Sequence, residues 1–68
     1  MLNERIRELR IASGISQVEL AEKLGVSKQS VSNWENDNIQ PSIEMLVKIA
    51  RVFNVSTDFL LGQDATLI

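Results

Sequence analysis

Apolar residues recur every three or four positions in five stretches of the sequence, and each stretch predicts an amphipathic helix. The expected helices cover about residues 3–13, 17–24, 28–36, 43–53 and 57–61. Gly14, Gly25 and Gly62 follow three of them, where a left-handed residue commonly ends a helix. No turn dipeptide joins two alternating apolar runs, so no hairpin competes. The pattern predicts an all-α fold, a compact bundle of five short helices.

A serine stands immediately before each of the last four expected helices: Ser16, Ser27, Ser42 and Ser56. A serine oxygen at this position can accept from the free amides of the first helical turn. Each serine is flanked by an apolar or ring residue before it and an apolar residue four positions later, which is the spacing of a hydrophobic staple. Ser16 and Glu19 also have the spacing of a capping box. Asn3 is the expected cap of the first helix.

The second and third helices are separated only by Gly25, Val26 and Ser27. A turn this short cannot lay two helices antiparallel, and sets them at a steep angle as in a helix-turn-helix. Around the third helix, at about 100° per residue, Val31 and Trp34 share one face. We therefore expect both side chains to point into the core.

The opposite arc of the third helix is polar. Its side chains are amides and a hydroxyl, with one lysine at the N-terminal end: Gln29, Ser32, Asn33, Asn36 and Lys28. Glutamine and asparagine can pair with adenine in a major groove, and lysine can reach guanine. The residues alone also allow an ordinary solvated face, and the short preceding turn favours DNA.

Composition excludes several classes of protein. With 68 residues the chain is one small domain, expected over 1–62, with 63–68 as a tail that is either a dimer contact or disordered. Cysteine and histidine are absent, so we expect no enzyme, metal or cofactor. Three carboxylates, Glu35, Asp37 and Glu44, are the weak alternative for a metal site. The apolar runs are too short for a membrane span, and a cytoplasmic protein is expected.

The net charge of the chain argues against DNA binding, because it is −2, with a pI near 4.9, whereas DNA-binding domains usually carry an excess of basic residues. Only the binding face meets phosphate, however, and the seven basic residues are spread along the chain. A weak electrostatic contribution would make binding depend more on base contacts and on dimerisation.

Three segments resemble a known family: IRELR at 6–10, SQVELAEKLGVSKQSVSNWEN at 16–36 and PSIEMLVKIARVFNVSTDFLLG at 41–62. They are similar to the phage-repressor and Cro type of helix-turn-helix transcriptional regulators, the XRE-like family. The resemblance covers residues 5–62 and implies a lambda-repressor-like fold in which the second and third helices form the helix-turn-helix. It also implies sequence-specific binding of double-stranded DNA, most often by a repressor.

The resemblance also implies roles for single residues. Lys28, Gln29 and Asn33 match the usual base-contacting positions. Four others match positions that contact the DNA backbone: Gln17, Ser30, Ser32 and Asn36. The sequence departs from the family in the loop DNIQ at 37–40, where relatives often carry lysine or arginine. That departure puts the phosphate contacts of this loop in doubt.

Arg10 and Glu35 form the last site that the sequence predicts. Arg10 lies beside Ile6 on the first helix, and Glu35 lies near Val31 on the third, so both charges face inward. A buried charge is costly unless it is paired, and we expect a partly buried ion pair with a structural role. The resemblance implies the same pair.

A single recognition helix reads few base pairs, so a homodimer on a pseudo-palindromic operator is expected. Apolar residues near the C-terminus are the candidate dimer contacts: Phe59, Leu60, Leu61, Leu67 and Ile68. The alternative is that Phe59 and Leu60 complete the core of the monomer. A protein-interaction module of the same fold is the competing function, and an enzyme is the weakest.

Overall fold

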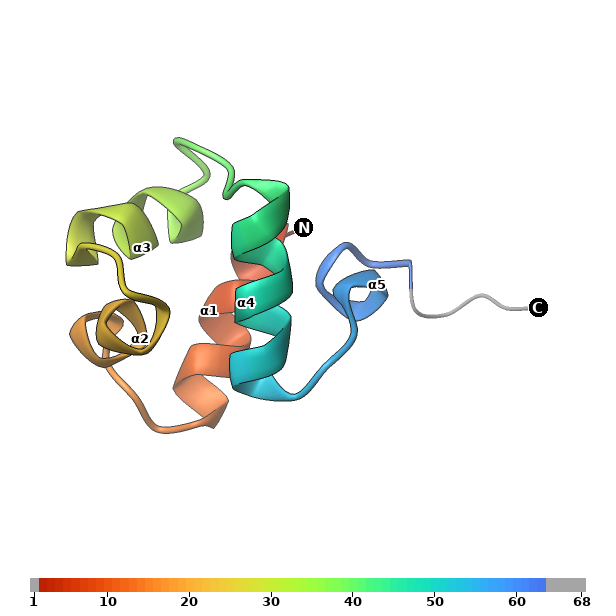
Figure 1. The fold of residues 1–68 in the computed structure, drawn as a ribbon, viewed down its shortest axis with the longest axis horizontal. Coiled ribbons are helices and arrows are strands. Elements are labelled where there is room, and N and C mark those ends of the chain that lie inside the picture. Colours follow the sequence, from red (N-terminus) through yellow and green to blue (C-terminus); the bar gives the residue numbers. More distant parts are fainter. Residues whose placement is uncertain (1, 64–68) are drawn as a thin grey trace.

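The computed structural model describes residues 2–63, which form five α-helices joined by short loops (Figure 1). In chain order they are α1 (Leu2–Ala12), α2 (Gln17–Leu24), α3 (Lys28–Glu35), α4 (Ile43–Phe53) and α5 (Thr57–Leu60). The expected all-α fold is confirmed, with α2 and α4 bounded as predicted. Residues 64–68 of the expected tail, including the candidate dimer residues Leu67 and Ile68, lie outside the described residues.

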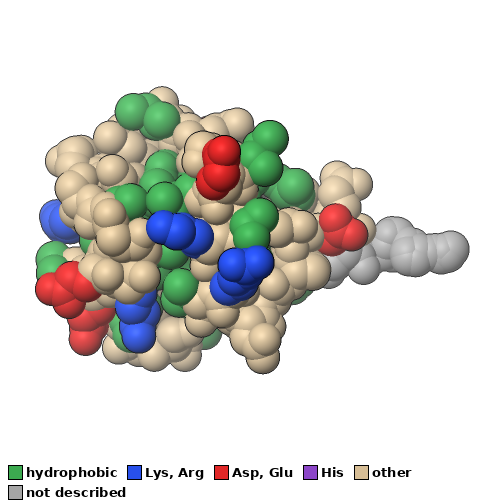
Figure 2. All heavy atoms as spheres, viewed as in Figure 1, with side chains coloured by type: hydrophobic (Ala, Val, Ile, Leu, Met, Phe, Trp, Pro, Cys, Tyr) green, Lys and Arg blue, Asp and Glu red, His purple; other side chains and the backbone are tan. Residues whose placement is uncertain are grey.

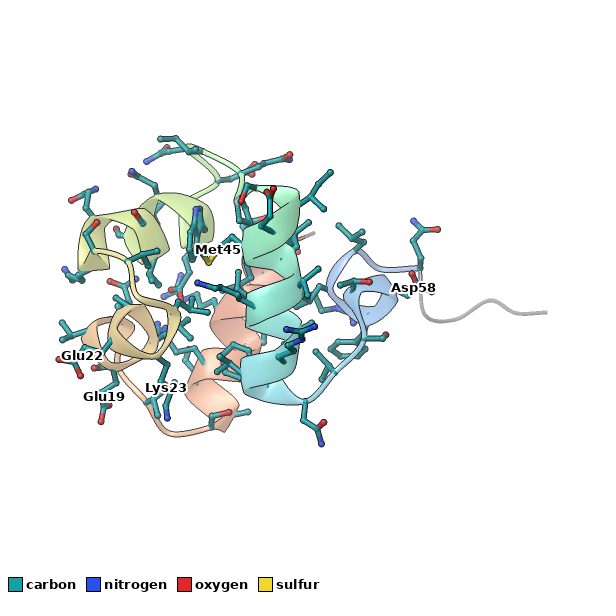
Figure 3. The ribbon with its side chains drawn as sticks, viewed as in Figure 1. Glu19, Glu22, Lys23, Met45 and Asp58 are labelled. Atoms are coloured by element: carbon teal, nitrogen blue, oxygen red, sulfur yellow. The ribbon has the colours of Figure 1, made fainter. Side chains whose placement is uncertain are left out.

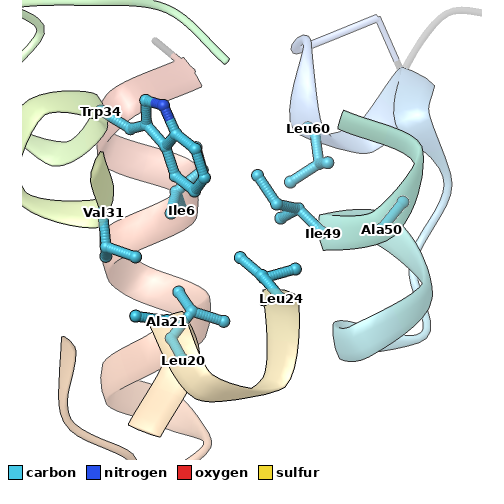
Figure 4. Close-up of a cluster of buried hydrophobic side chains, with 9 residues drawn as sticks. All are labelled: Ile6, Leu20, Ala21, Leu24, Val31, Trp34, Ile49, Ala50 and Leu60. Carbon is cyan, nitrogen blue, oxygen red and sulfur yellow. The ribbon is translucent and has the colours of Figure 1, made fainter. Parts of the chain in front are cut away.

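Helices α1 and α4 lie side by side at the centre, with α2 and α3 on one side of them and α5 on the other (Figure 1). The core is where these helices meet, and all five contribute to it (Figure 4). Its buried apolar residues are Ile6, Leu20, Ala21, Leu24, Val31, Trp34, Ile49, Ala50 and Leu60. As predicted, Val31 and Trp34 point inward, at 0% and 7% exposure.

The four serine caps are present. Each serine hydroxyl accepts a hydrogen bond from the backbone N–H three residues later, at 3.0–3.2 Å. The Ser16–Glu19 pair forms the reciprocal capping box, because the Glu19 carboxylate also accepts from the Ser16 N–H at 2.8 Å. These bonds satisfy amides that have no partner inside the helix. They explain why helix starts were predictable from local sequence.

The first helix starts earlier than the sequence indicated. Leu2 is already helical, so Asn3 lies inside the first turn and the prediction of Asn3 as the cap is wrong. Leu2 packs against the core, which favours helix through this end of the chain. At the other ends the differences are single residues: α1 stops at Ala12, α3 at Glu35 and α5 at Leu60.

Helix α4 buries most, but not all, of the face that its pattern predicts, with Leu46, Ala50 and Phe53 in or against the core. The apolar spacing of the sequence also predicts Ile43 and Val47 on this face, but they are 78% and 36% exposed, whereas Ile49 is fully buried. Eight of the eleven residues of this helix are apolar, so the helical period leaves the edges of the apolar face poorly defined. Packing of α4 against α1, α2 and α5 decides which of its apolar residues are buried, and the helical period alone does not predict that packing.

The C-terminal helix is fastened to α1. Arg5 donates to the Phe59 carbonyl at 2.9 Å, and its guanidinium lies 4.2 Å from the centre of the Phe59 ring. Leu60 is fully buried. The alternative therefore holds for Leu60, which completes the monomer core, whereas Phe59 is half-buried and is held by Arg5. Of the proposed dimer contacts in residues 2–63, only Leu61 is exposed, at 42%.

No helix in the described part of the chain is long and apolar enough to cross a membrane.

Candidate nucleic-acid interface

The turn between α2 and α3 has the conformation that its three residues predict. Gly25 is left-handed, with φ 74° and ψ 32°, which a residue without a Cβ adopts at little cost. Val26 then donates its N–H to the Ala21 carbonyl at 3.0 Å and packs against the core. Ser27 caps α3. The turn fixes α3 against α2, so the exposed face of α3 is held on a packed support.

The outward face of α3 carries the polar side chains that the sequence predicted there. Lys28 and Gln29 are exposed at its N-terminal end, Asn33 is half-buried one turn later, and Asn36 is exposed just past the helix. Gln29 donates from Nε2 to the Asn33 Oδ1 at 3.1 Å. This bond leaves the Gln29 carbonyl oxygen and the Asn33 amide hydrogens available for other partners. The structure thus brings two expected base-contacting residues together.

The expected backbone-contacting residues lie around this face. Asn36 donates from Nδ2 to the Ser32 Oγ at 3.3 Å. The Ser30 hydroxyl lies 3.2 Å from the Ser27 hydroxyl, beside the cap of α3. Gln17 is the first residue of α2 and is half-buried. These side chains come from α3, from the residue that follows it and from the start of α2.

Arg10 and Glu35 meet in a bidentate ion pair. Arg10 Nε donates to Glu35 Oε2 at 2.7 Å, and Arg10 Nη2 donates to Glu35 Oε1 at 3.1 Å. The side chain of Glu35 is 2% exposed and that of Arg10 is 14% exposed. Hydrogen bonding to Glu35 raises the pKa of Arg10 above its usual value, although burial opposes this. Arg10 therefore stays charged and pairs α1 with α3.

Two further contacts converge on this pair. Arg10 Nη1 donates to the Ile15 carbonyl at 3.0 Å, and Gln17 Nε2 donates to Glu35 Oε1 at 3.0 Å. We call this cluster of Arg10, Ile15, Gln17 and Glu35 the polar node. It joins α1, α2, α3 and the loop before α2. Sequence reasoning placed Gln17 at the DNA backbone and missed its bond to Glu35, because nothing in the local pattern relates the start of α2 to the end of α3.

Charged side chains elsewhere on the surface are of both signs. Glu19, Glu22 and Lys23 extend outward from α2, and Asp58 lies at the far end of the molecule, while Met45 lies between α4 and α3 (Figure 3). The face seen in Figure 2 likewise mixes basic and acidic groups without a continuous basic patch. Within residues 2–63, no three acidic side chains are grouped closely enough to hold a metal ion.

Known proteins match most of the chain. A family model described as Helix-turn-helix matches residues 6–60. The HTH-type transcriptional regulator ImmR of Bacillus subtilis is 43% identical over 63 residues, 93% of this chain and 50% of that protein. The HTH-type transcriptional regulator SinR of Bacillus subtilis is 42% identical over 64 residues, 93% of this chain and 58% of that protein. This chain spans about half the length of the curated relatives it matches.

Solved structures share the fold as well as the sequence. The P22 c2 repressor, crystallised in complex with a synthetic operator, superimposes with a TM-score of 0.87 at 34% identity, covering 94% of this chain and 97% of that one. SinR in complex with DNA superimposes with a TM-score of 0.83 at 42% identity, covering 90% and 98% of the two chains.

Proposed function

The chain belongs to the XRE-type helix-turn-helix family, and from that premise we propose that it binds double-stranded DNA sequence-specifically and acts as a transcriptional repressor. Two solved relatives are bound to DNA, one of them a repressor in complex with a synthetic operator. In this proposal α3 enters the major groove. Lys28, Gln29 and Asn33 contact base edges, while the residues around them contact the DNA backbone: Gln17, Ser30, Ser32 and Asn36.

The observation that carries the proposal is the contrast between the two faces of α3. Its inner face is fully used, since Val31, Trp34 and Glu35 are buried. Its outer face presents amides, hydroxyls and one lysine on a helix that cannot rotate without exposing that core. A rigidly held helix whose outer side chains still have available hydrogen-bond donors and acceptors can pair with the base edges exposed in a major groove.

The first test is selection of bound duplexes from random DNA by the purified chain. A shared motif among the selected duplexes supports the proposal. Tight binding of a protein partner across Lys28, Gln29 and Asn33, with no salt-sensitive DNA binding, would instead identify a protein-interaction module.

Alanine substitutions then test the assignment of residues. Lys28→Ala, Gln29→Ala and Asn33→Ala should each weaken binding to the selected site by about 1–3 kcal/mol and relax preference at a base position. Lys23→Ala, on α2, is the matched control for lost charge and should leave base preference unchanged. Binding titrations against single-base variants of the site measure both effects. Unchanged specificity in all three interface variants would contradict this assignment.

We also propose that two copies bind together on a pseudo-palindromic operator, since one recognition helix contacts too few base pairs for adequate specificity. Leu61 is the exposed member of the C-terminal set in residues 2–63 and is the proposed contact there. Leu61→Ala should reduce cooperative binding to a full site and leave binding to a single half-site unchanged. Equal affinity of the wild-type chain for half-sites and full sites would contradict the dimer.

A further inference from the structure

The polar node contains an interaction between the core and the proposed DNA-contacting surface. Glu35 Oε1 accepts two hydrogen bonds, from Arg10 Nη2 at 3.1 Å and from Gln17 Nε2 at 3.0 Å. Glu35 is buried, whereas Gln17 is half-buried and stands at the start of α2. One side chain therefore connects a buried carboxylate to a residue that borders the interface.

The chemistry of the carboxylate fixes which end of the Gln17 amide faces it. An ionised carboxylate can only accept hydrogen bonds, so the amide must present its nitrogen to Glu35 and turn its oxygen elsewhere. The other oxygen of Glu35, Oε2, accepts from Arg10 Nε at 2.7 Å. The same Gln17 nitrogen carries a second N–H, and no hydrogen bond from it is present within residues 2–63.

The backbone next to Gln17 is held by the same pair. Arg10 Nη1 donates to the carbonyl of Ile15, two residues before Gln17, at 3.0 Å. The Ser16 capping box immediately precedes Gln17 and orders the first turn of α2. Both the backbone and the side-chain amide of Gln17 are thus restrained before any ligand arrives.

We propose that Glu35 is a positioning residue for DNA binding: through its bond to the Gln17 Nε2, it orients the second N–H of that amide toward a backbone phosphate. The inference rests on the proposed function. Its physical basis is preorganisation, because a long side chain that is already immobilised loses less freedom when it forms the contact. Glu35 touches no DNA in this arrangement, and Arg10 contributes by holding the carboxylate in place through two hydrogen bonds.

The test compares two double variants that both remove the ion pair. Arg10→Met/Glu35→Gln retains an oxygen acceptor for Gln17, and Arg10→Met/Glu35→Met replaces it with an unbranched apolar side chain of similar length. Gln17→Ala is introduced into each variant and into the wild-type chain. Affinities for a selected site and for a scrambled duplex are then measured at a temperature where circular dichroism shows all six proteins to be folded.

Gln17→Ala should weaken binding to both duplexes by about tenfold in the wild-type chain, the size expected for a hydrogen bond to a charged group. The loss should be similar with Gln at position 35 and about threefold smaller with Met, where the Gln17 side chain is free. Loss by the same factor in all three backgrounds would overturn the inference and leave the proposed function standing. No DNA binding by the wild-type chain would overturn both.

A measurement on the wild-type chain keeps the inference testable if the Met variant does not fold. The side-chain amide of Gln17 should have an NMR order parameter near that of rigid backbone, about 0.85, while the exposed Gln40 should be below about 0.6. Equal mobility of the two amides in the free protein would overturn the positioning role of Glu35.

Discussion

Glu35 is the residue on which stability and the proposed DNA binding both depend. It is 5% exposed and lies on the buried side of the helix whose other side carries the interface. Its two oxygens receive three hydrogen bonds from Arg10 and Gln17. Ionised carboxylates are tolerated in a core when their lone pairs are satisfied in this way, and an unpaired one is strongly destabilising.

Removing one member of the ion pair should destabilise the domain severely. A broken buried pair typically costs about 3–5 kcal/mol, and the 14% exposure of the Arg10 side chain places this pair toward the lower end. A domain of this size has only about 5 kcal/mol in total. Arg10→Ala and Glu35→Ala should therefore lower the melting temperature sharply, as measured by circular dichroism.

Arg7→Ala is the matched control, because Arg7 is exposed on the same helix. It should change stability by less than about 0.5 kcal/mol. Arg10→Met/Glu35→Met should recover much of the loss, because neither charge is then left buried alone. Small, additive effects of the two single alanine substitutions would show that the charges do not stabilise each other.

Among single residues, those whose environment is set by their own helix were predictable from the sequence. The positions of Val31 and Trp34 around the helix axis predicted that they lie in the core. The positions of Arg10 and Glu35 predicted that both charges face inward and pair. The Gln17–Glu35 and Arg5–Phe59 contacts were not predictable, because they join helix ends that are distant in sequence. They depend on helix-crossing geometry that no local pattern contains.

At the scale of the element, the first turn of each later helix is specified by its serine. The hydroxyl satisfies an amide that the helix leaves unpaired, so this signal acts within four residues and does not depend on tertiary packing. The buried face of α4 was not specified in this way. Ile43 and Val47 satisfy the same period as Leu46 and Ala50, and only packing against other helices exposes the first two.

Ser42→Ala should destabilise the domain by about 1 kcal/mol, because it removes the acceptor that the Met45 N–H uses at the start of α4. Ser13→Ala is the control: Ser13 is exposed and follows α1, with no capping role. Chemical denaturation of the two variants measures the difference. Equal stability of both would mean that water replaces the Ser42 hydroxyl at no cost.

At the scale of the whole molecule, the position of α3 should contribute more to DNA binding than the charge of the domain does. The net charge is −2, and Lys28 is the sole basic residue of α3. The loop after α3 begins with the acidic Asp37. Binding to DNA should therefore rely on base contacts, on neutral donors such as Gln17 and on the pairing of two copies. The affinity for the operator should then exceed the affinity for unrelated DNA by a large factor.

This charge balance predicts a shallow dependence of DNA affinity on salt. If about two to four phosphates per monomer are neutralised, the logarithm of the binding constant should fall with the logarithm of salt concentration with a slope of about −2 to −4 per monomer. Gln17→Ala should weaken binding without changing this slope, because a neutral amide displaces no counterion. A slope as steep as about −10 would show that the acidic balance had been misjudged.

Two substitutions in the loop after α3 separate local charge from net charge. Asn38→Lys adds a cation at an exposed position and should steepen the slope by about 0.9, provided that the loop approaches a phosphate.

Asp37→Asn removes an acidic group while keeping a residue type that tolerates the left-handed φ of 61° found there. It should raise affinity for all duplexes at low salt, and the gain should fade as the screening length shortens. The control is Asp58→Asn, which makes the same charge change on α5, at the opposite end of the molecule from α3 (Figure 3). An equal gain from both positions would mean that only net charge matters, and that the loop does not approach DNA.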